Sequence, residues 1–328
     1  MWEENLYLSK KLKNKFVKGY NFPIHVYEEP YFSYLLRLYN EDFGTLEKWK
    51  EFYTQFLDHF NSEEHFFQKY NNLKDLAIDK IVNSDGYEKF QNLDMNDWKV
   101  DSKEFNNRPK NIYLQNNHNE LFWSIDFKKA NFYTLKYFDI IKEDTYLQFI
   151  NNIEPPESDL DSLLPKIKFF EESKQLRQVI FGHANPKRQQ KIQSYFLFQL
   201  YKDLKKSLGD EIEEIYVLGS DEIIFKPNKP DGNKVQVNQF IEQEQDKIPY
   251  PLSVNPFLVK QLSSARNVYV KEYGDRFELK NVPNYFYPQY YKYYLNYEID
   301  HNLDLVFFHD GKLAEFVNIN EDIRRNYE

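Results

Sequence analysis

The sequence predicts an α+β protein, because helical and strand-like segments occupy different parts of the chain. Residues 1–105 place apolar side chains mostly at helical spacing. Residues 106–235 interleave strand-like runs with helical stretches, and residues 236–328 are richest in strand-like runs. This order is typical of α+β architecture. We therefore expect a helical N-terminal domain, a central mixed core and a mixed α/β C-terminal region with these boundaries.

The composition indicates a folded chain with a large aromatic core. Of its 328 residues, 41% are hydrophobic and 18% are aromatic, including 29 Phe and 27 Tyr. Each aromatic side chain buries a large area, so that a core can be built from fewer residues, whereas disordered chains have few aromatics. The abundance of Asn, Lys, Tyr, Phe and Ile is typical of AT-rich genomes, such as those of parasites, phages and large viruses.

The same composition excludes several classes of protein. The chain has no cysteine, which excludes disulfides, thiolate metal sites and a cysteine nucleophile, and which suits a reducing compartment. Charges come too early for a signal peptide, and no stretch has the roughly 18 apolar residues of a membrane span. We therefore expect an intracellular protein without a membrane partner. The scattered histidines disfavour a zinc site, and no phosphate-binding loop, dinucleotide-binding turn or serine-hydrolase elbow occurs.

Aromatic side chains recur at helical spacing in the first region. Helices are predicted over Tyr31–Tyr39, Leu46–Phe60 and Glu63–Asn71. Asn61-Ser62 followed by two glutamates is a helix start. The aromatic stripe consists of Trp49, Phe52, Tyr53, Phe56, Leu57 and Phe60. We interpret it as a core face rather than a binding groove.

The pattern changes near Arg108-Pro109, where strand-like runs begin. Asn111–Gln115 and Leu121–Asp126 flank a polar segment, which predicts a β-hairpin. Helical stretches follow at Lys128–Asp139, at Asp144–Ile153 (ending before Pro155-Pro156) and at Leu160–Phe181.

The longest predicted helix begins after Asn185, a good N-cap, with Pro186 in the first helical position. Gly209 can end this helix. Glu213–Leu218 and Glu222–Phe225 then form a second predicted strand pair around the turn Gly219-Ser220-Asp221.

The last region combines an acidic helix near Val237–Gln245 with strand-like runs, and Asp310-Gly311 is a strong hairpin turn. The runs are Asn267–Lys271, Phe277–Lys280, Leu305–His309 and Leu313–Val317. The segment Tyr285–Tyr294 is dense in tyrosine and, with only Lys280 and Lys292 nearby, carries little positive charge. We favour a packed core or a surface for a protein partner over stacking on single-stranded nucleic acid.

Three acidic residues have a setting that suits a metal site. Asp126 ends an aromatic strand, and Asp221 and Glu222 lie in the turn of a hydrophobic hairpin. Strand ends can bring such carboxylates together at a sheet edge, and Mg2+ is held by one or two carboxylates plus phosphate oxygens. Two metals can stabilise the attacking and leaving oxygens of phosphoryl transfer. The alternative is that these are ordinary turn residues.

A basic segment lies between these acids in the sequence. The segment Arg177–Lys191 gathers four cations, Arg177, Lys187, Arg188 and Lys191. The last three lie in the first turns of the longest helix, where they oppose the helix dipole. Cations and free N–H groups at a helix start suit a phosphate, and Gly182 would allow close approach of a phosphate or a base. A solvated surface patch balancing Glu171 and Glu172 is equally compatible.

In this order the segments resemble the A, B and C motifs of palm-domain polymerases. The resemblance rests on SIDFKKANFYTL (Ser124–Leu135), RQVIFGHANPKRQQK (Arg177–Lys191) and YVLGSDEIIF (Tyr216–Phe225). The last is also similar to the Ser-Asp-Glu motif of tRNA-His guanylyltransferases and to the Gly-Gly-Asp-Glu-Phe turn of diguanylate cyclases. The resemblance covers roughly residues 111–226 and implies an antiparallel palm sheet with helices on one face.

The resemblance also implies roles for single residues. Asp126, Asp221 and the main-chain carbonyl of Phe127 would bind Mg2+ or Mn2+, with Glu222 beside them. Arg177, Lys187, Arg188 and Lys191 would hold a nucleoside triphosphate. Tyr133 would lie under its sugar, although Phe132 and Tyr133 also read as core residues. Three departures are Phe127 where the guanylyltransferases have Gly, the turn Gly-Ser-Asp-Glu, and the missing Lys-x3-Asn-Ser-x-Tyr-Gly pattern.

The sequence therefore predicts a metal-dependent nucleotidyltransferase that adds nucleotides to the end of a nucleic acid, either DNA or RNA. The alternative is a non-catalytic structural, replication-complex or transcription-complex subunit, viral or cellular, that binds a protein or nucleic-acid partner. The net charge of −9 repels nucleic acid, so such binding requires a local basic cluster.

Overall fold

The computed structural model describes residues 8–101, 105, 111–154, 164–229, 234–264 and 266–316. The chain divides into two compact units. The first unit combines Met1–Lys80, Thr145–Ile180 and Asn281–Glu328, and the second combines Ile81–Asp144 and Phe181–Lys280. Each unit is thus built from segments that are far apart in the sequence. The division at residues 105 and 235 is a different partition of the chain and stays a prediction.

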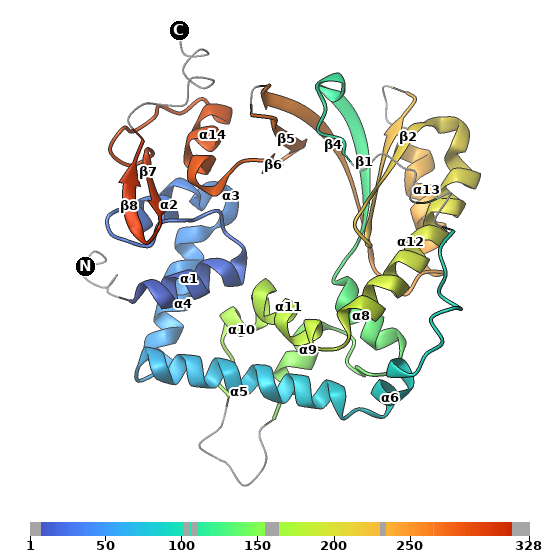
Figure 1. The fold of residues 1–328 in the computed structure, drawn as a ribbon, viewed down its shortest axis with the longest axis horizontal. Coiled ribbons are helices and arrows are strands. Elements are labelled where there is room, and N and C mark those ends of the chain that lie inside the picture. The colour runs from blue at the N-terminus through green and yellow to red at the C-terminus, as the bar shows by residue number, and fades with distance from the viewer. Residues whose placement is uncertain are drawn as a thin grey trace. The chain divides into compact units, whose positions relative to one another are not determined.

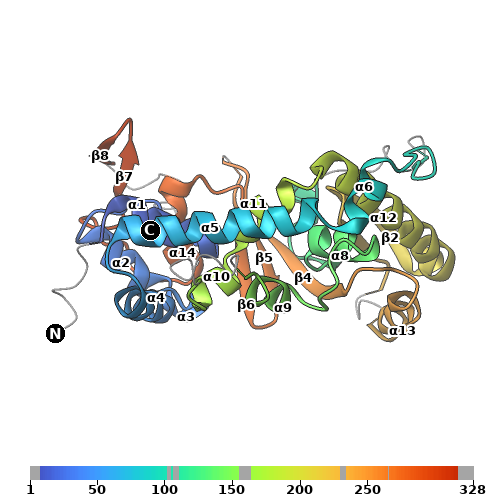
Figure 2. The same ribbon diagram turned by 90° about the horizontal axis from the view of Figure 1, so that it is seen from below.

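The first unit is mainly helical and ends in a small hairpin (Figures 1 and 2). Its elements are α1 (Lys10–Tyr20), α2 (Tyr31–Leu38), α3 (Asn40–Phe43), α4 (Thr45–His59), most of α5 (Glu63–Val82), α9 (Tyr146–Asn151), α10 (Lys168–Glu172), most of α11 (Lys174–Gly182), η4 (Asn284–Phe286), α14 (Tyr287–Tyr294), β7 (Val306–His309) and β8 (Lys312–Glu315). The helices predicted in the N-terminal region are therefore present.

Aromatic rings form the core of the first unit, as the stripe on α4 predicts. Trp49, Phe52, Phe56 and Phe60 are buried, and Phe52 lies 5.1 Å from the ring of Phe169 on α10. Tyr53 is only half-buried and Leu57 is 59% exposed, so these two stripe members are not core residues. The core-face interpretation is confirmed for the other four.

The predicted helical run Leu160–Phe181 is interrupted in the structure. Residues 160–163 lie outside the described residues, as do Pro155-Pro156 and Arg108-Pro109. The described part forms two helices, α10 and α11, that meet at Ser173. The Ser173 hydroxyl accepts a hydrogen bond of 3.1 Å from the N–H of Leu176, which starts the second helix.

The tyrosine-rich segment Tyr285–Tyr294 contributes mainly to the core of the first unit. It forms η4 and α14, in which Tyr290 and Tyr291 are fully buried. Tyr285 is 43% exposed, and its ring contacts the rings of Phe286 and Phe316 at steep angles. A protein-binding role of this segment stays a prediction.

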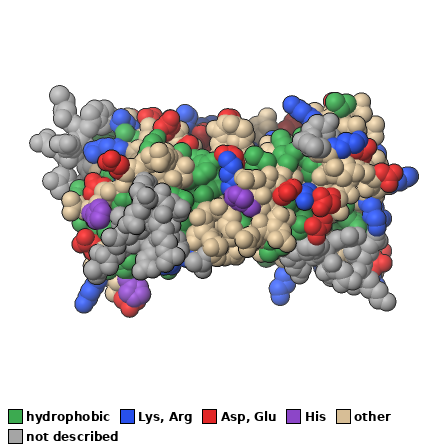
Figure 3. Space-filling model, turned by 90° about the horizontal axis from the view of Figure 1, so that it is seen from above, with side chains coloured by type: hydrophobic (Ala, Val, Ile, Leu, Met, Phe, Trp, Pro, Cys, Tyr) green, Lys and Arg blue, Asp and Glu red, His purple; other side chains and the backbone are tan. Residues whose placement is uncertain are grey.

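The surface carries both signs of charge. On the face drawn in Figure 3, acidic and basic side chains are interspersed. None of the described helices is long and apolar enough to cross a membrane.

The second unit contains a six-stranded antiparallel sheet in the order β2-β3-β1-β4-β5-β6 (Figure 1). The strands are β1 (Glu120–Phe127), β2 (Ile212–Leu218), β3 (Glu222–Pro227), β4 (Leu252–Ser263), β5 (Val268–Tyr273) and β6 (Arg276–Lys280). The helices of this unit are α6 (Asp85–Gln91), η1 (Gln115–Asn117), α8 (Ala130–Tyr137), α12 (Pro186–Leu208), η3 (Gly209–Glu211) and α13 (Lys234–Gln245). The α+β class is therefore confirmed. Apart from α8–α11, which intervene after β1, the order of β1, α12, the hairpin β2–β3, α13 and β4 is that of a split βαβ arrangement.

The predicted hairpin of Asn111–Gln115 with Leu121–Asp126 is wrong in its first strand. Residues 111–114 have no regular structure and lead into η1. The Asn117 amide donates a hydrogen bond of 2.9 Å to the Ile112 carbonyl, which folds this segment back on itself. Both sides of β1 are instead paired with β3 and β4, so no edge is left for another strand.

Strand β4 is the longest strand and is missing from the sequence prediction. Its apolar pattern is broken by Asn255-Pro256, and a proline argues against a central strand. In the structure, β4 pairs with β5 only from Leu258 onward. The exposed Pro256 therefore lies where β4 is still an edge strand, and its missing N–H leaves no ladder bond unmade.

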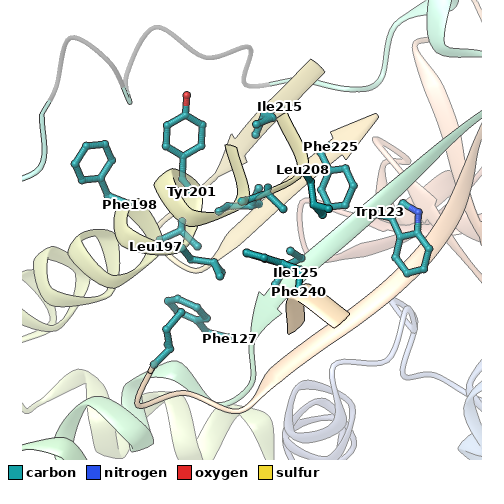
Figure 4. Packing of buried hydrophobic residues seen from close by; sticks show 14 of the residues in the cluster. Trp123, Ile125, Phe127, Leu197, Phe198, Tyr201, Leu208, Ile215, Phe225 and Phe240 are labelled. Carbon is teal, nitrogen blue, oxygen red and sulfur yellow. The ribbon is translucent and has the colours of Figure 1, made fainter. Parts of the chain in front are cut away.

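One face of the sheet is covered by α12 and α13 (Figure 4). Trp123, Ile125 and Phe127 of β1 point to this side and pack with Leu197 of α12 and Phe240 of α13. Because side chains alternate along a strand, Ser124 and Asp126 lie on the opposite face. Only that face can therefore present polar side chains of β1 to a ligand.

Helix α12 begins as predicted. The Asn185 side chain accepts a hydrogen bond of 3.3 Å from the N–H of Arg188, and Pro186 is the first helical residue. The helix ends at Leu208, directly before Gly209. Its first turns lie near the β2–β3 turn, and this proximity defines the candidate site.

Candidate functional site

The structure brings Asp126 and the Asp221-Glu222 turn to adjacent strand ends. Asp126 is the direct partner of Glu222 in the β1–β3 pairing and of Ser253 in the β1–β4 pairing. Asp221 immediately precedes β3, and its carbonyl accepts a hydrogen bond of 2.9 Å from the N–H of Phe127. Carboxylates far apart in the sequence thus meet at one edge of the sheet.

The turn that carries Asp221 depends on a glycine. Gly219 has a positive φ of 66°, and a Cβ atom there would lie 3.3 Å from the Oδ1 atom of Asp221. A larger side chain would be strained by its backbone conformation and would crowd the carboxylate. Gly219 therefore allows the tight turn that places Asp221 beside β1.

The carboxylates at this edge are partly buried and close to one another, so their ionised forms are disfavoured. Burial raises the pKa of Asp126 to about 7, and the negative charges of Asp221 and Glu222 contribute to this rise. Burial and the charge of Glu222 raise the pKa of Asp221, although the backbone N–H groups of Ser220 and Asp221 lower it. A bound divalent cation would favour the ionised carboxylates and so relieve this crowding.

Glu222 is held by groups that the sequence reasoning missed. Its Oε1 atom accepts hydrogen bonds from the Ser124 hydroxyl at 2.7 Å and from the Lys271 ammonium at 3.3 Å. The Lys271 side chain is only 5% exposed, and its Nζ atom lies 4.5 Å from the centre of the Phe257 ring. Lys271 is thus a built-in counter-charge for Glu222. Strand alternation places Ser124 on the face of Asp126, but nothing in the sequence indicates that β5 brings Lys271 to it.

Gln193 of α12 connects the site to its surroundings. Its side chain is 2% exposed, and its Nε2 atom donates to Asn131 at 2.8 Å and to the Thr134 hydroxyl at 3.2 Å. Its Oε1 atom accepts from the Ser220 hydroxyl at 3.2 Å, directly beside Asp221. One buried amide therefore joins α8, which follows Asp126, to the turn that holds Asp221. A glutamine at helical spacing with the apolar residues Ile192, Leu197 and Leu200 of α12 is the signal that could have found it.

Replacing Gln193 by Met is expected to weaken the candidate site while the fold survives. The three hydrogen bonds would be lost, but the volume of the side chain would remain. Loss of such an outer support typically costs about 10–100-fold in metal affinity or activity. We expect the Mg2+ concentration at half-maximal activity to rise by that amount, with Gln190→Met on the exposed side of α12 as the control. An unchanged Mg2+ dependence would show that Gln193 serves packing alone.

The donor set fits a hard divalent cation. Asp126 and Asp221 offer carboxylate oxygens, and Phe127 offers a main-chain carbonyl next to them. Among the described residues, no three His, Cys, Asp or Glu side chains are close enough together to hold a metal ion. Two carboxylates are the usual protein share when substrate phosphates and water complete the shell of Mg2+. The residues therefore fit a cation that binds together with a phosphate-bearing substrate.

In the metal-free protein, the titration of Asp126 predicts that the melting temperature depends on pH. Because its pKa is raised to about 7, the associated stability is present at low pH and is lost as the pH rises through 7. Asp126→Asn removes the ionisable group. We expect the variant to melt a few degrees above the wild type at pH 8 and by a clearly smaller margin at pH 5, because the loss begins near the ordinary pKa of 3.8 and is complete only above 7. Equal melting temperatures at both pH values would contradict the crowding of these acids.

The basic residues at the start of α12 have different surroundings. Lys187 and Lys191 are exposed and lie one helical turn apart. Arg188 is half-buried, and its Nη1 atom donates a hydrogen bond of 2.8 Å to the Leu93 carbonyl. Gly182 is exposed, and a Cβ atom there would meet nothing within 4 Å. At the start of this helix, Lys187 and Lys191 are thus exposed to an anion, whereas Arg188 is held by the Leu93 carbonyl.

Arg177 belongs to the other unit of the chain. It lies on α11, and its guanidinium carbon is 5.5 Å from the centre of the Tyr146 ring. Burial lowers the pKa of Arg177. The four cations that are close in the sequence are therefore divided between the two units.

The two aromatic candidates are packed against the helix-covered core. The Phe127 ring stacks on Tyr250 with the ring centres 4.4 Å apart. Tyr133 of α8 is half-buried and packs against the same cluster. Its position agrees with the alternative of a core role, and contact with a sugar stays a prediction.

Comparison of the chain with protein-family models, with curated proteins and with solved structures gave no match. The function must therefore be argued from the site itself.

Proposed function

We propose that this chain is a metal-dependent phosphoryl-transfer enzyme. Within that class, we propose a nucleotidyltransferase with a palm-type core that adds nucleotides to the end of a nucleic acid. One observation carries the proposal: the β1–β3 register sets Asp126 beside the Asp221-Glu222 turn. A palm built from the three motifs would bring the two strand ends together in this way.

The architecture around the acids supports the same proposal. The sheet is antiparallel, and α12 and α13 cover the face opposite to Asp126. A palm has an antiparallel sheet with helices on one face, which leaves its other face for substrate. The strand-end acids, the helix with a basic start and the acid-bearing hairpin occur here in the order A, B and C.

In the proposed site, different residues bind the metal ion, bind the triphosphate and support the site. Asp126, Asp221 and the Phe127 carbonyl would hold Mg2+ or Mn2+, which supplies charge stabilisation for the attacking and leaving oxygens. Lys187 and Lys191, exposed at the start of α12, would bind phosphates of a nucleoside triphosphate. Gln193 supports the Asp221 turn, and Lys271 pairs with Glu222 and offsets part of its negative charge. Such chemistry depends on positioning and electrostatics.

The direct experiment is incorporation of a labelled nucleoside triphosphate into an oligonucleotide with Mg2+ or Mn2+. DNA and RNA primers, with and without a template, would be supplied in parallel. Incorporation that requires the metal supports the proposal. Absence of incorporation under every combination would contradict it.

A non-catalytic role is the second candidate, and one observation favours it. The Asp221 carboxylate accepts hydrogen bonds from the backbone of Ser220 and Asp221, as in an ordinary turn. Melting the protein with and without Mn2+ and triphosphate separates the two functions. A protein that binds these ligands is stabilised by them, whereas an unchanged melting temperature favours the non-catalytic role.

A further inference from the structure

Helix α1 concentrates positive charge in an acidic chain. Its eleven residues, KKLKNKFVKGY, include no acid, while the whole chain has a net charge of −9. The lysines of this helix are Lys10, Lys11, Lys13, Lys15 and Lys18. Elsewhere, acidic and basic side chains are interspersed, as Figure 3 shows for one face. The helix is therefore a local exception to the charge of the protein.

Two of these lysines are neutralised by carboxylates of the same unit. Lys10 pairs with Glu28, and the largely buried Lys13 pairs with Glu29 at 2.6 Å. These ion pairs tie α1 to the segment that follows it. They leave the other face of α1, which carries Lys15 and Lys18, with its charge uncompensated.

Lys15 and Lys18 lie one turn apart on α1, and Lys15 lies over the ring of Tyr70 on α5, one turn from Lys74, so that these three lysines form a cationic cluster. Within the described parts of the chain, Lys15 and Lys18 have no carboxylate at ion-pair distance. Lys74 pairs only with its neighbour Asp75, at 3.1 Å, whose side chain is mostly exposed. Burial, followed by the charges of Lys74 and Lys18, lowers the pKa of Lys15 to about 8.

Aromatic rings and a buried hydroxyl group of α5 lie next to these lysines. The Nζ atom of Lys15 lies 3.7 Å from the centre of the Tyr70 ring and donates to Gln175 at 3.3 Å. The Tyr70 hydroxyl is buried and has no hydrogen-bond partner among the described residues. Lys11 lies 4.2 Å from the centre of the Phe67 ring, one turn away on the same two helices. Surfaces that bind single-stranded nucleic acid combine positive charge with aromatic side chains.

A bound anion would relieve the mutual repulsion of these lysines. Three ammonium groups repel one another, and the chain has enough acids to pair with every one of them. A polyanion with regularly spaced charges would relieve the repulsion and release its own counterions. Because a protein of net charge −9 can hold nucleic acid only through a local basic cluster, this cluster has the chemistry of such a contact.

We propose that Lys15, Lys18 and Lys74 bind the phosphate backbone of a nucleic-acid strand, a choice of polyanion that rests on the proposed function. The surface belongs to the first unit alone, since α1 and this part of α5 lie within it. It would hold the strand by charge, without reading its sequence.

The test measures binding of a fluorescent single-stranded oligonucleotide to the full chain between 50 and 200 mM salt. The variant replaces the three lysines by Gln. Each lost phosphate contact reduces the slope of log affinity against log salt by about 0.7, so the slope should fall by about 2. A matched control replaces Lys202, Lys205 and Lys206 of α12 by Gln, which removes the same charge, and should leave most of the slope.

Three outcomes would overturn the proposal. The first is a variant that binds with the slope of its control, and the second is a melting temperature of the variant that falls by more than a few degrees. The third is displacement of the oligonucleotide by an acidic peptide at equal charge concentration, which would assign the surface to a protein partner. Binding that depends on these lysines, in a protein that incorporates no nucleotide, would refute the proposed catalysis and leave this surface standing.

Discussion

Replacing Asp126 by Asn is expected to abolish metal-dependent incorporation of nucleotides. The amide keeps the shape of the side chain but removes the negative charge that would hold the cation next to the reacting phosphate. Loss of one such electrostatic group typically lowers the rate by about 10²–10³-fold, and loss of a metal ligand by at least as much. Asp221→Asn should have the same effect, because the two carboxylates share one site. The measurement is incorporation of labelled triphosphate at saturating Mg2+ or Mn2+.

Asp139→Asn is the matched control for both substitutions. Asp139 is exposed, follows α8 in the same unit and has a positive φ of 56°, which Asn also tolerates. It should retain full activity. The metal assignment would be untenable if Asp126→Asn and Asp221→Asn also retained full activity. It would be equally untenable if either variant lost activity only because it no longer folds, which circular dichroism would show.

Replacing Phe127 by Ala is expected to destabilise the second unit by about 3–5 kcal/mol. The ring is only 2% exposed and stacks on Tyr250 at an interplanar angle of 13°. Its removal would leave a cavity between β1 and the helices and would loosen the strand that ends in Asp126. Urea unfolding followed by tryptophan fluorescence can report this loss, because Trp123 lies in the same cluster.

Phe308→Ala provides the comparison, since Phe308 of β7 is 42% exposed. A substitution at a surface position should change the free energy of unfolding by about 0.5 kcal/mol or less. Similar losses for the two phenylalanines would mean that the Phe127 side of the sheet is not the packed core.

Local sequence patterns were sufficient for most of the secondary structure. Asn185-Pro186 and Gly209 bracket α12 because caps depend on neighbouring residues only. The runs that form β2 and β3 are apolar and flank a turn with a glycine, and they too are encoded within a few residues. By contrast, Asn111–Gln115 has the composition of a strand but no partner to pair with, and β4 contains a proline that only an edge position tolerates.

In the candidate site too, some features follow from the local sequence and others from contacts between distant residues. The residue types at Asp126, Asp221 and Glu222, their order and their places at strand ends could be read from the chain. Their surroundings could not, since Lys271 reaches Glu222 from β5 and Gln193 reaches Ser220 from α12. The sequence also grouped Arg177 with Lys187, Arg188 and Lys191, whereas the structure assigns Arg177 to the other unit.

The sequence by itself determined the α+β class, the start and end of α12 and the acids that end β1 and begin β3, because these depend on spacing and on capping between near neighbours. Only the tertiary structure decided which strands pair, which face of the sheet the helices cover and which cations accompany each carboxylate. Those features depend on contacts between residues distant in the chain, whose energies no local pattern records. The crowding of Asp126 by Asp221 and Glu222 and the lysine cluster of α1 and α5 both arise from such contacts.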